Sequence, residues 1–102
     1  MDNRLELHEE FCDILCSRNV YFQPPESVKM KYPAIVYARK AIDNIMADNR
    51  AYKQNWGYEV TYIDKDPDSE NVKKLSQLPY CRYDRHFVAD NLNHDVFTLY
   101  RE

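Results

Sequence analysis

The residues best suited to chemistry form one polar cluster near the end of the chain, in the stretch ADNLNHDVFTLY. As a general base, His94 could be oriented by Asp95 or Asp90, with Cys81 or a serine as the nucleophile. Asp and Asn also tolerate left-handed backbone, which is typical of a tight connection between two strands. We therefore predict a structural turn and no catalytic residue. The residues assigned to this turn are Asp90, Asn91, Asn93, His94 and Asp95.

A metal site is the second chemical hypothesis. His8, Cys12 and Cys16 stand four residues apart and would line one side of a helix. A metal ion there would need a fourth ligand from elsewhere in the chain, and buried reduced cysteine is far commoner. The three cysteines cannot all pair with one another. We expect reduced thiols, no bound metal and no cofactor.

A third cluster, in DKDPDSENVKKLSQLP, alternates three acids like the first ligands of a calcium loop. Counted from Asp64, Ser69 stands where such a loop needs glycine, and Leu75 stands where it needs a bidentate glutamate. The calcium hypothesis therefore fails on two positions.

A helix explains more of the same segment. Asp66 is predicted to cap it, with Pro67 at the first helical position and acids in the first turn. Val72, Leu75 and Leu78 would then lie on one buried face.

The remaining elements follow from hydrophobic periodicity and turn residues. We predict a helix from Asn3 to about Arg18, a short strand at 20–22, a strand from 34, a long protruding loop or irregular hairpin at 40–51, a strand at 52–64, the helix described above, and two closing strands at 80–88 and 95–102. In the strand at 80–88, Cys81, Tyr83, Arg85 and Phe87 are predicted to share one face.

This order indicates an α+β fold, because a small sheet has one apolar face that helices must cover. We expect a mostly antiparallel sheet of about four strands covered by two helices, with the protruding segment between strands. At 102 residues the chain is long enough for one core, so residues 1–102 are predicted to form one domain.

Composition limits the classes of function. The net charge is −3, which argues against strong binding to nucleic-acid phosphates. No apolar stretch is long enough to cross a bilayer, and the charged start does not suit a signal peptide. The chain has fourteen aromatic residues and one glycine, which is compatible with a half-buried sheet or with a protein-binding surface.

Two segments are candidates for that surface. The segment 40–51 holds apolar residues with no clear core period, so a neighbouring subunit or partner is expected to bury them. Arg82 and Arg85 could bind an acidic partner, although charges on an outward strand face are more often solvated or paired across strands. The predicted interface residues are Ile42, Ile45, Met46, Asn49, Arg50, Tyr52, Arg82 and Arg85.

The segments YPAIVYAR, ADNRAY, YEVTYIDKDPDSE and LPYCRYDRHFVADNLNHDVFTLY, within residues 32–100, resemble the small tail-completion or tail-terminator proteins of long-tailed phages and prophages. The resemblance implies a subunit that assembles, commonly as a hexameric ring, at the head-proximal end of the tail tube. Its partners would be copies of itself, the tail tube protein and the head connector or completion protein. Such a protein would be assembled in the bacterial cytoplasm and reside in the tail or neck of the virion.

Physical arguments are compatible with this resemblance. A ring joins different surfaces of neighbouring subunits and needs apolar patches outside the core. A mildly acidic ring would let double-stranded DNA pass without sequence-specific binding. Two alternatives remain: a head-completion or adaptor protein of the phage neck, and a small non-catalytic inhibitor that binds one target.

Overall fold

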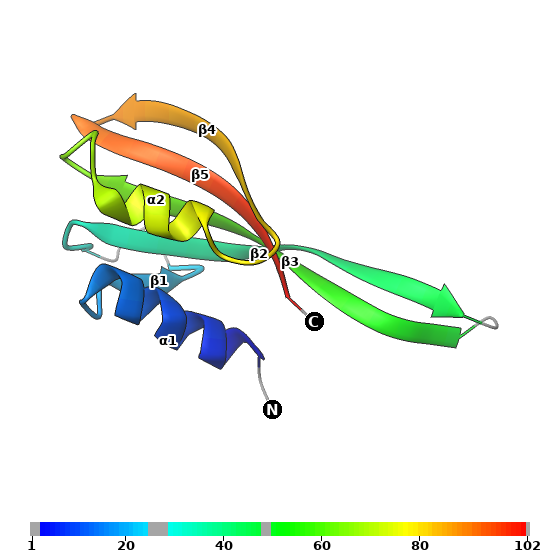
Figure 1. Ribbon diagram of the computed structural model, residues 1–102. Helices are drawn as coiled ribbons and strands as arrows, with labels where there is room; N and C mark the ends of the chain where they lie inside the picture. Colours follow the sequence, from blue (N-terminus) through cyan, green and yellow to red (C-terminus); the bar gives the residue numbers. More distant parts are fainter. Residues whose placement is uncertain (1–2, 25–28, 48–49, 102) are drawn as a thin grey trace.

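The computed structural model describes residues 3–24, 29–47 and 50–101. In these residues it is the predicted α+β fold, with two helices and a mostly antiparallel sheet, and the sheet has five strands where about four were expected. The elements are α1 (Asn3–Leu15), β1 (Val20–Phe22), β2 (Ala34–Ala47), β3 (Arg50–Asp64), α2 (Glu70–Ser76), β4 (Cys81–Ala89) and β5 (Leu92–Arg101). The strand order is β1-β2-β3-β5-β4, with β1 parallel to β2 and the other neighbours antiparallel. In Figure 1, β4 forms one edge of this sheet, and the paired ends of β2 and β3 project beyond it.

Both helices pack on one face of the sheet. Phe11 of α1 lies edge-on to Tyr37 of β2, with ring centroids 5.1 Å apart, and Tyr37 lies edge-on to Tyr58 of β3 at 6.0 Å. The Tyr37 hydroxyl also bonds to Nδ1 of His8 at 2.8 Å, so the polar end of this buried ring is satisfied. The strand predicted at 52–64 contributes to this core, since every second residue from Tyr58 to Tyr62, namely Tyr58, Val60 and Tyr62, is buried in it.

The first helix is shorter than predicted. It ends at Leu15 and not near Arg18, because Cys16 adopts a left-handed backbone with φ of 56°. The backbone N–H of Ser17 then donates to the carbonyl of Cys12 at 3.2 Å, which closes the last turn. Leu7, Phe11 and Leu15 form the buried stripe of this helix.

The cap of the second helix differs from the prediction. Ser69, not Asp66, is the N-cap, and its hydroxyl accepts from the backbone N–H of Asn71 at 3.3 Å. Asp66 instead accepts from the backbone N–H of Asp68 at 2.9 Å, so it stabilises the preceding turn. The predicted apolar face is confirmed: Leu75 is buried, and its neighbours Val72 and Leu78 pack against the core.

Candidate assembly interface

A two-stranded arm extends beyond the body of the protein. Strand β5 pairs with β3 only from Trp56 onward. Residues 43–47 of β2 and 50–55 of β3 therefore pair with each other and with no other described strand. We call these two segments the arm. The prediction of a protruding loop or irregular hairpin at 40–51 is resolved as a hairpin, with register shifts between Arg39 and Ala41 and between Ile45 and Met46.

The arm makes the molecule elongated. Its principal extents are 51 × 25 × 23 Å and its radius of gyration is 14.6 Å. A compact domain of this length has a radius of gyration of about 13 Å. Figure 1 shows the arm as the cause, since it projects past the ends of β4 and β5.

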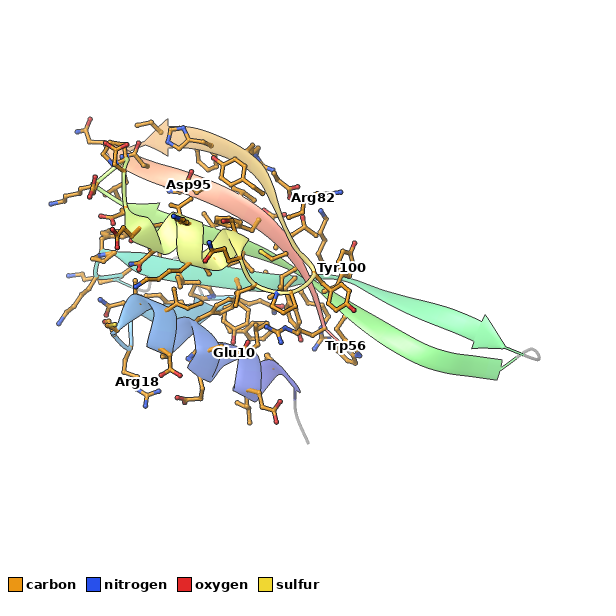
Figure 2. All side chains as sticks on the ribbon, in the orientation of Figure 1. Glu10, Arg18, Trp56, Arg82, Asp95 and Tyr100 are labelled. Atoms are coloured by element: carbon orange, nitrogen blue, oxygen red, sulfur yellow. The ribbon has the colours of Figure 1, made fainter. Side chains whose placement is uncertain are left out.

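Side chains from four elements, β2, β3, β5 and α1, interact at the base of the arm. The guanidinium of Arg39 lies over the ring of Trp56, 4.5 Å from its centroid. Arg101, which pairs with Trp56 across the β3–β5 ladder, forms an ion pair with Glu10 of α1 at 2.6 Å. Figure 2 shows Trp56 and Tyr100 where the arm leaves the sheet. These contacts join α1 and the sheet directly beside the arm.

Most residues predicted to make the interface lie in this segment. The backbones of Ile42, Ile45, Met46, Arg50 and Tyr52 lie in β2 and β3. The placement of their side chains, and all of Asn49, lies outside the described residues.

Strand β4 is the second candidate surface, because it lies at the edge of the sheet and pairs with a strand on one side only. Its apolar side chains are largely open to solvent: Tyr83, Phe87 and Val88 are 44, 41 and 61% exposed, and the preceding Tyr80 is 82% exposed. Charged residues, which commonly protect sheet edges from pairing, lie in the first part of this strand at 82–85, and residues 86–89 contain no Lys, Arg, Asp, Glu or Pro. An exposed strand edge with apolar side chains is a binding surface for another strand.

A bulge at Asp84 changes which residues of β4 share a face. Tyr83 pairs with Phe97 and Arg85 with Val96, so Asp84 is the extra residue between them. The predicted common face of Cys81, Tyr83, Arg85 and Phe87 is therefore wrong beyond Tyr83, because one inserted residue reverses the alternation.

The bulge directs Asp84 into a polar network on the face opposite the helices. The hydroxyl of buried Thr98 donates to Asp84, and Lys40 Nζ donates to the same hydroxyl at 3.4 Å. The hydrogen bond from Thr98, followed by Arg82 and the charge of Lys40, outweighs burial and lowers the pKa of Asp84. Since Lys40 belongs to β2, the network spans the sheet.

The two arginines proposed for partner binding are partly engaged. Arg82 Nε donates to Asp84 Oδ1 at 3.2 Å, and Arg85 lies 3.9 Å from Glu59 of β3. Both arginine side chains remain mostly exposed, and Figure 2 shows Arg82 beside β4. They are paired within the sheet, as the alternative interpretation expected, and they also remain accessible to a partner.

The predicted hairpin turn is present but shorter. Asp90 and Asn91 form a two-residue turn with φ of 53° and 62°, the left-handed values for which Asp and Asn are suited. Asn93, His94 and Asp95 belong instead to β5, so their assignment to the turn was wrong. The continuous β4–β5 ladder up to Ala89 and Leu92 explains the difference.

These three β5 residues make separate contacts. The amide of Asn93 donates to the carbonyl of Lys65 at 3.2 Å and thereby holds the β3–α2 connection. His94 stacks on Phe87 with centroids 4.6 Å apart, and Asp95 is buried against Tyr83.

The structure does not bring the hypothetical catalytic set together. Cys81 pairs with Leu99 and His94 with Phe87, five residues apart along β5 and on opposite faces of the sheet. Burial raises the pKa of the Cys81 thiol to about 11, which disfavours the reactive thiolate.

Neither hypothetical metal site is assembled among the described residues. Asp64 and Asp66 each accept a backbone N–H two residues ahead, so these oxygens stabilise a turn. In residues 3–24, 29–47 and 50–101, no three His, Cys, Asp or Glu side chains are grouped to hold an ion.

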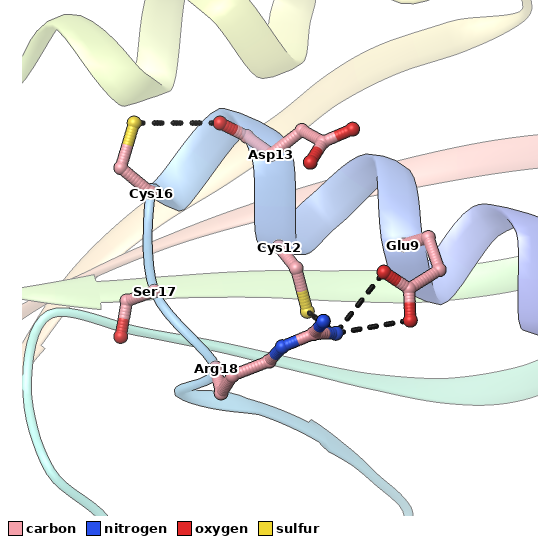
Figure 3. Close-up of a pocket in the computed structure, with 6 residues that line it drawn as sticks. All are labelled: Glu9, Cys12, Asp13, Cys16, Ser17 and Arg18. Carbon is pink, nitrogen blue, oxygen red and sulfur yellow. Dashed lines mark hydrogen bonds and ion pairs between the residues drawn. The ribbon is translucent and has the colours of Figure 1, made fainter.

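The cysteines of α1 border an open pocket, shown in Figure 3. Arg18 crosses it, donating to Glu9 at 2.9 Å and to the Cys12 sulfur at 3.7 Å. Cys16 contacts the carbonyl of Asp13, and His8 bonds to Tyr37 instead of facing the thiols. The pocket is a surface hollow closed on one side by an ion pair.

No described helix is long and apolar enough to cross a membrane. Comparison with known proteins found no matching family and no significantly similar curated sequence.

Sequence reasoning missed the β4 edge as a continuous surface. It treated Arg82 and Arg85 as the binding residues and left Val88 without a role. Strand order was the missing information, since nothing in the local pattern tells an edge strand from a central one.

Proposed function

We propose that this protein is a non-catalytic assembly subunit that forms a ring at the head-proximal end of a phage tail tube, ends tube polymerisation and joins tail to head. The observation that carries the proposal is the arm. A two-stranded ribbon is only marginally stable in water and gains stability when further strands or another surface cover it. An arm that extends from a body with its own core is therefore suited to contact a neighbouring subunit.

The positions of the arm and of the β4 edge fit a ring. The arm is built from β2 and β3, whereas β4 ends the strand order on the other side of β5. A contact between such unlike surfaces is heterologous, so each subunit offers one surface to the preceding neighbour and the other to the next. Repetition of this contact closes a ring when the rotation between subunits allows it.

The net charge and the ion pairs of the exposed arginines favour a ring through which DNA passes over one that binds DNA tightly. The net charge is −3, and the exposed arginines of β4 lie near carboxylates, Arg82 beside Asp84 and Arg85 near Glu59. Paired guanidiniums hold phosphate less strongly than free ones, and a protein that neutralises few phosphates releases few counterions. Double-stranded DNA would thus pass through the ring without tight binding.

In this function the partners are other copies of the chain, the tail tube protein and the head connector or completion protein. This function requires no chemical reaction, because binding between complementary surfaces is sufficient for assembly. The polar residues at the end of the β4–β5 hairpin then serve structure, as their contacts with Lys65, Phe87 and Tyr83 suggest.

Polymerisation of the tail tube protein in the presence of this protein tests the proposal. We expect shorter tubes, each with a ring at one end by electron microscopy, and an assembly mass of several subunits by light scattering. Binding to the isolated head portal without any effect on tube length would favour the adaptor role instead. A protein that remains monomeric with the tube protein present would exclude both roles.

A further inference from the structure

The backbone of β4 carries unpaired hydrogen-bonding groups whose directions follow from the ladder. Ala89 and Leu92 flank the two-residue turn, and such a flanking pair is hydrogen-bonded. Hydrogen-bonded and non-hydrogen-bonded pairs alternate along an antiparallel ladder. His86 and Val88, which pair with Asp95 and Asn93, therefore direct their N–H and C=O groups away from β5.

The free edge is regular over residues 85–89. The bulge at Asp84 interrupts the strand before this run, and the hairpin turn at Asp90 ends it. Val88 has a side chain 61% exposed on the outer part of this run, and Phe87 is 41% exposed on the opposite face. A strand added here would gain backbone hydrogen bonds and would cover apolar side chains on both faces.

The arm offers the complementary edge. Its strands comprise residues 43–47 and 50–55, and each has a partner on one side only among the described residues. The run of five residues on β4 matches the arm strand 43–47 in length, whereas the arm strand 50–55 contains the extra residue of the register shift opposite Ile45 and Met46. Pairing between the two would stabilise both, because the arm would become part of a three-stranded sheet and the β4 edge would be covered by a neighbouring strand.

We propose that one strand of the arm pairs with residues 85–89 of β4 in a second copy of this chain, so that the sheet of one subunit continues into the next. The inference rests on the proposed ring function and names the contact that builds the ring. A second copy is the occupant because the two free edges lie at different places on the same chain. Each subunit can therefore give its arm and receive another arm at once, which is the requirement of a head-to-tail assembly.

Proline at Val88 tests the contact at one backbone atom. Proline lacks the N–H group, but Val88 does not use that group toward β5, so the β4–β5 ladder should survive. We expect Val88→Pro to weaken association by about tenfold or more, measured by light scattering across a concentration series. Val88→Ala is the matched control, since it trims the exposed side chain and keeps the N–H group. It should still assemble.

A second variant removes the arm. Residues 44–54 are replaced by an Asn-Gly turn that joins Asp43 to Asn55, neighbours in the β2–β3 ladder. The arm extends beyond the sheet that the helices cover, so circular dichroism and thermal melting should show a folded protein. Light scattering should show that this protein stays monomeric. Mixed with Val88→Pro, it should form a one-to-one heterodimer, because one variant keeps the β4 edge and the other keeps the arm.

The outcomes separate this contact from the ring function. Assembly of Val88→Pro at the wild-type concentration would overturn the contact and leave the ring possible through another surface. Self-association of the armless variant would overturn it in favour of pairing between two β4 edges. Wild-type protein that stays monomeric with tube protein present would remove the proposed function itself. If Val88→Pro does not fold, His86→Pro at the other outward position provides the same test.

Discussion

Tyr83 donates a hydrogen bond to Asp95 across the β4–β5 ladder, with 2.8 Å between the phenolic oxygen and Oδ1. The two residues are not direct neighbours in the ladder: Tyr83 pairs with Phe97 and stacks edge-on against its ring at 5.3 Å. Asp95 is only 7% exposed, so its carboxylate depends on this donor. The pair fixes the exposed edge strand to the buried one, beside the surface proposed to receive an arm.

Replacement of Tyr83 by phenylalanine should therefore destabilise the fold. Tyr83→Phe keeps the ring on Phe97 and removes only the hydroxyl that serves Asp95. Loss of a donor to a buried charged group costs about 1–3 kcal/mol, which urea denaturation would measure. The double variant Tyr83→Phe with Asp95→Asn should lose less unfolding free energy than Tyr83→Phe alone, because it leaves no buried carboxylate without a donor. An unchanged midpoint in Tyr83→Phe would show that water serves the carboxylate instead.

The same tyrosine should make stability depend on alkaline pH. Burial, and then the hydrogen bond to Asp95, raises the pKa of Tyr83 to about 12, whereas tyrosine in an unfolded chain has a pKa of about 10. Because the folded pKa is the higher one, this stabilisation is complete below pH of about 10 and is lost as the pH rises through about 12. The difference in unfolding free energy between wild type and Tyr83→Phe should shrink over that window. Tyr37 and Tyr62, whose pKa values are also raised, act equally in both proteins.

On the other face, Thr98→Val should weaken the protein mainly on the acid side. Valine has nearly the shape of threonine but cannot donate to Asp84, and Thr98 is 1% exposed. The hydrogen bond lowers the pKa of Asp84, so its contribution is present above the pKa of an unfolded aspartate and is lost as the pH falls through the folded value. We expect a loss of about 1.5–3 kcal/mol near pH 7, measured by urea denaturation. The loss should become smaller toward pH 3. A loss that is constant with pH would point to packing as the cause.

Ser69→Ala should destabilise more than Asp66→Ala. Ser69 caps α2 and its hydroxyl also bonds to Tyr62 at 2.9 Å, whereas Asp66 serves one exposed turn. Loss of an N-cap side chain typically costs about 0.5–2 kcal/mol. Thermal melting of the two variants, made side by side, compares them directly. The reverse order would restore Asp66 as the residue that starts the helix.

An acidic substitution in the arm should block assembly without loss of the fold. Ile45 and Met46 lie on the arm strand of β2, beyond the part of the sheet covered by β5. Ile45→Asp or Met46→Asp introduces a charge that an interface would have to desolvate. We expect a normal melting temperature and a failure to join tails to heads in a phage complementation assay. Asp43→Asn, in the same strand, is the control that adds no charge. Unfolding of the Asp variants would make the arm part of the core.

Periodicity located most elements because each has its own local cause. The alternation of Tyr58, Val60 and Tyr62 required one buried face whatever the neighbours were, and the structure confirms that face. The stripe of Leu7, Phe11 and Leu15 likewise predicted the first helix. Element ends were less accurate, since Cys16 and Ser69 depend on single backbone and hydroxyl contacts that no period records.

What the sequence by itself determined is the set of elements and the left-handed turn at Asp90 and Asn91, where propensity and side-chain chemistry act within a few residues. Tertiary structure alone decided that β4 is an edge, that Asp84 is bulged toward Thr98, and that β5 ends opposite Trp56 so that an arm is left. These features depend on which strands lie side by side. That choice minimises exposed apolar area over the whole chain, so no single segment encodes it.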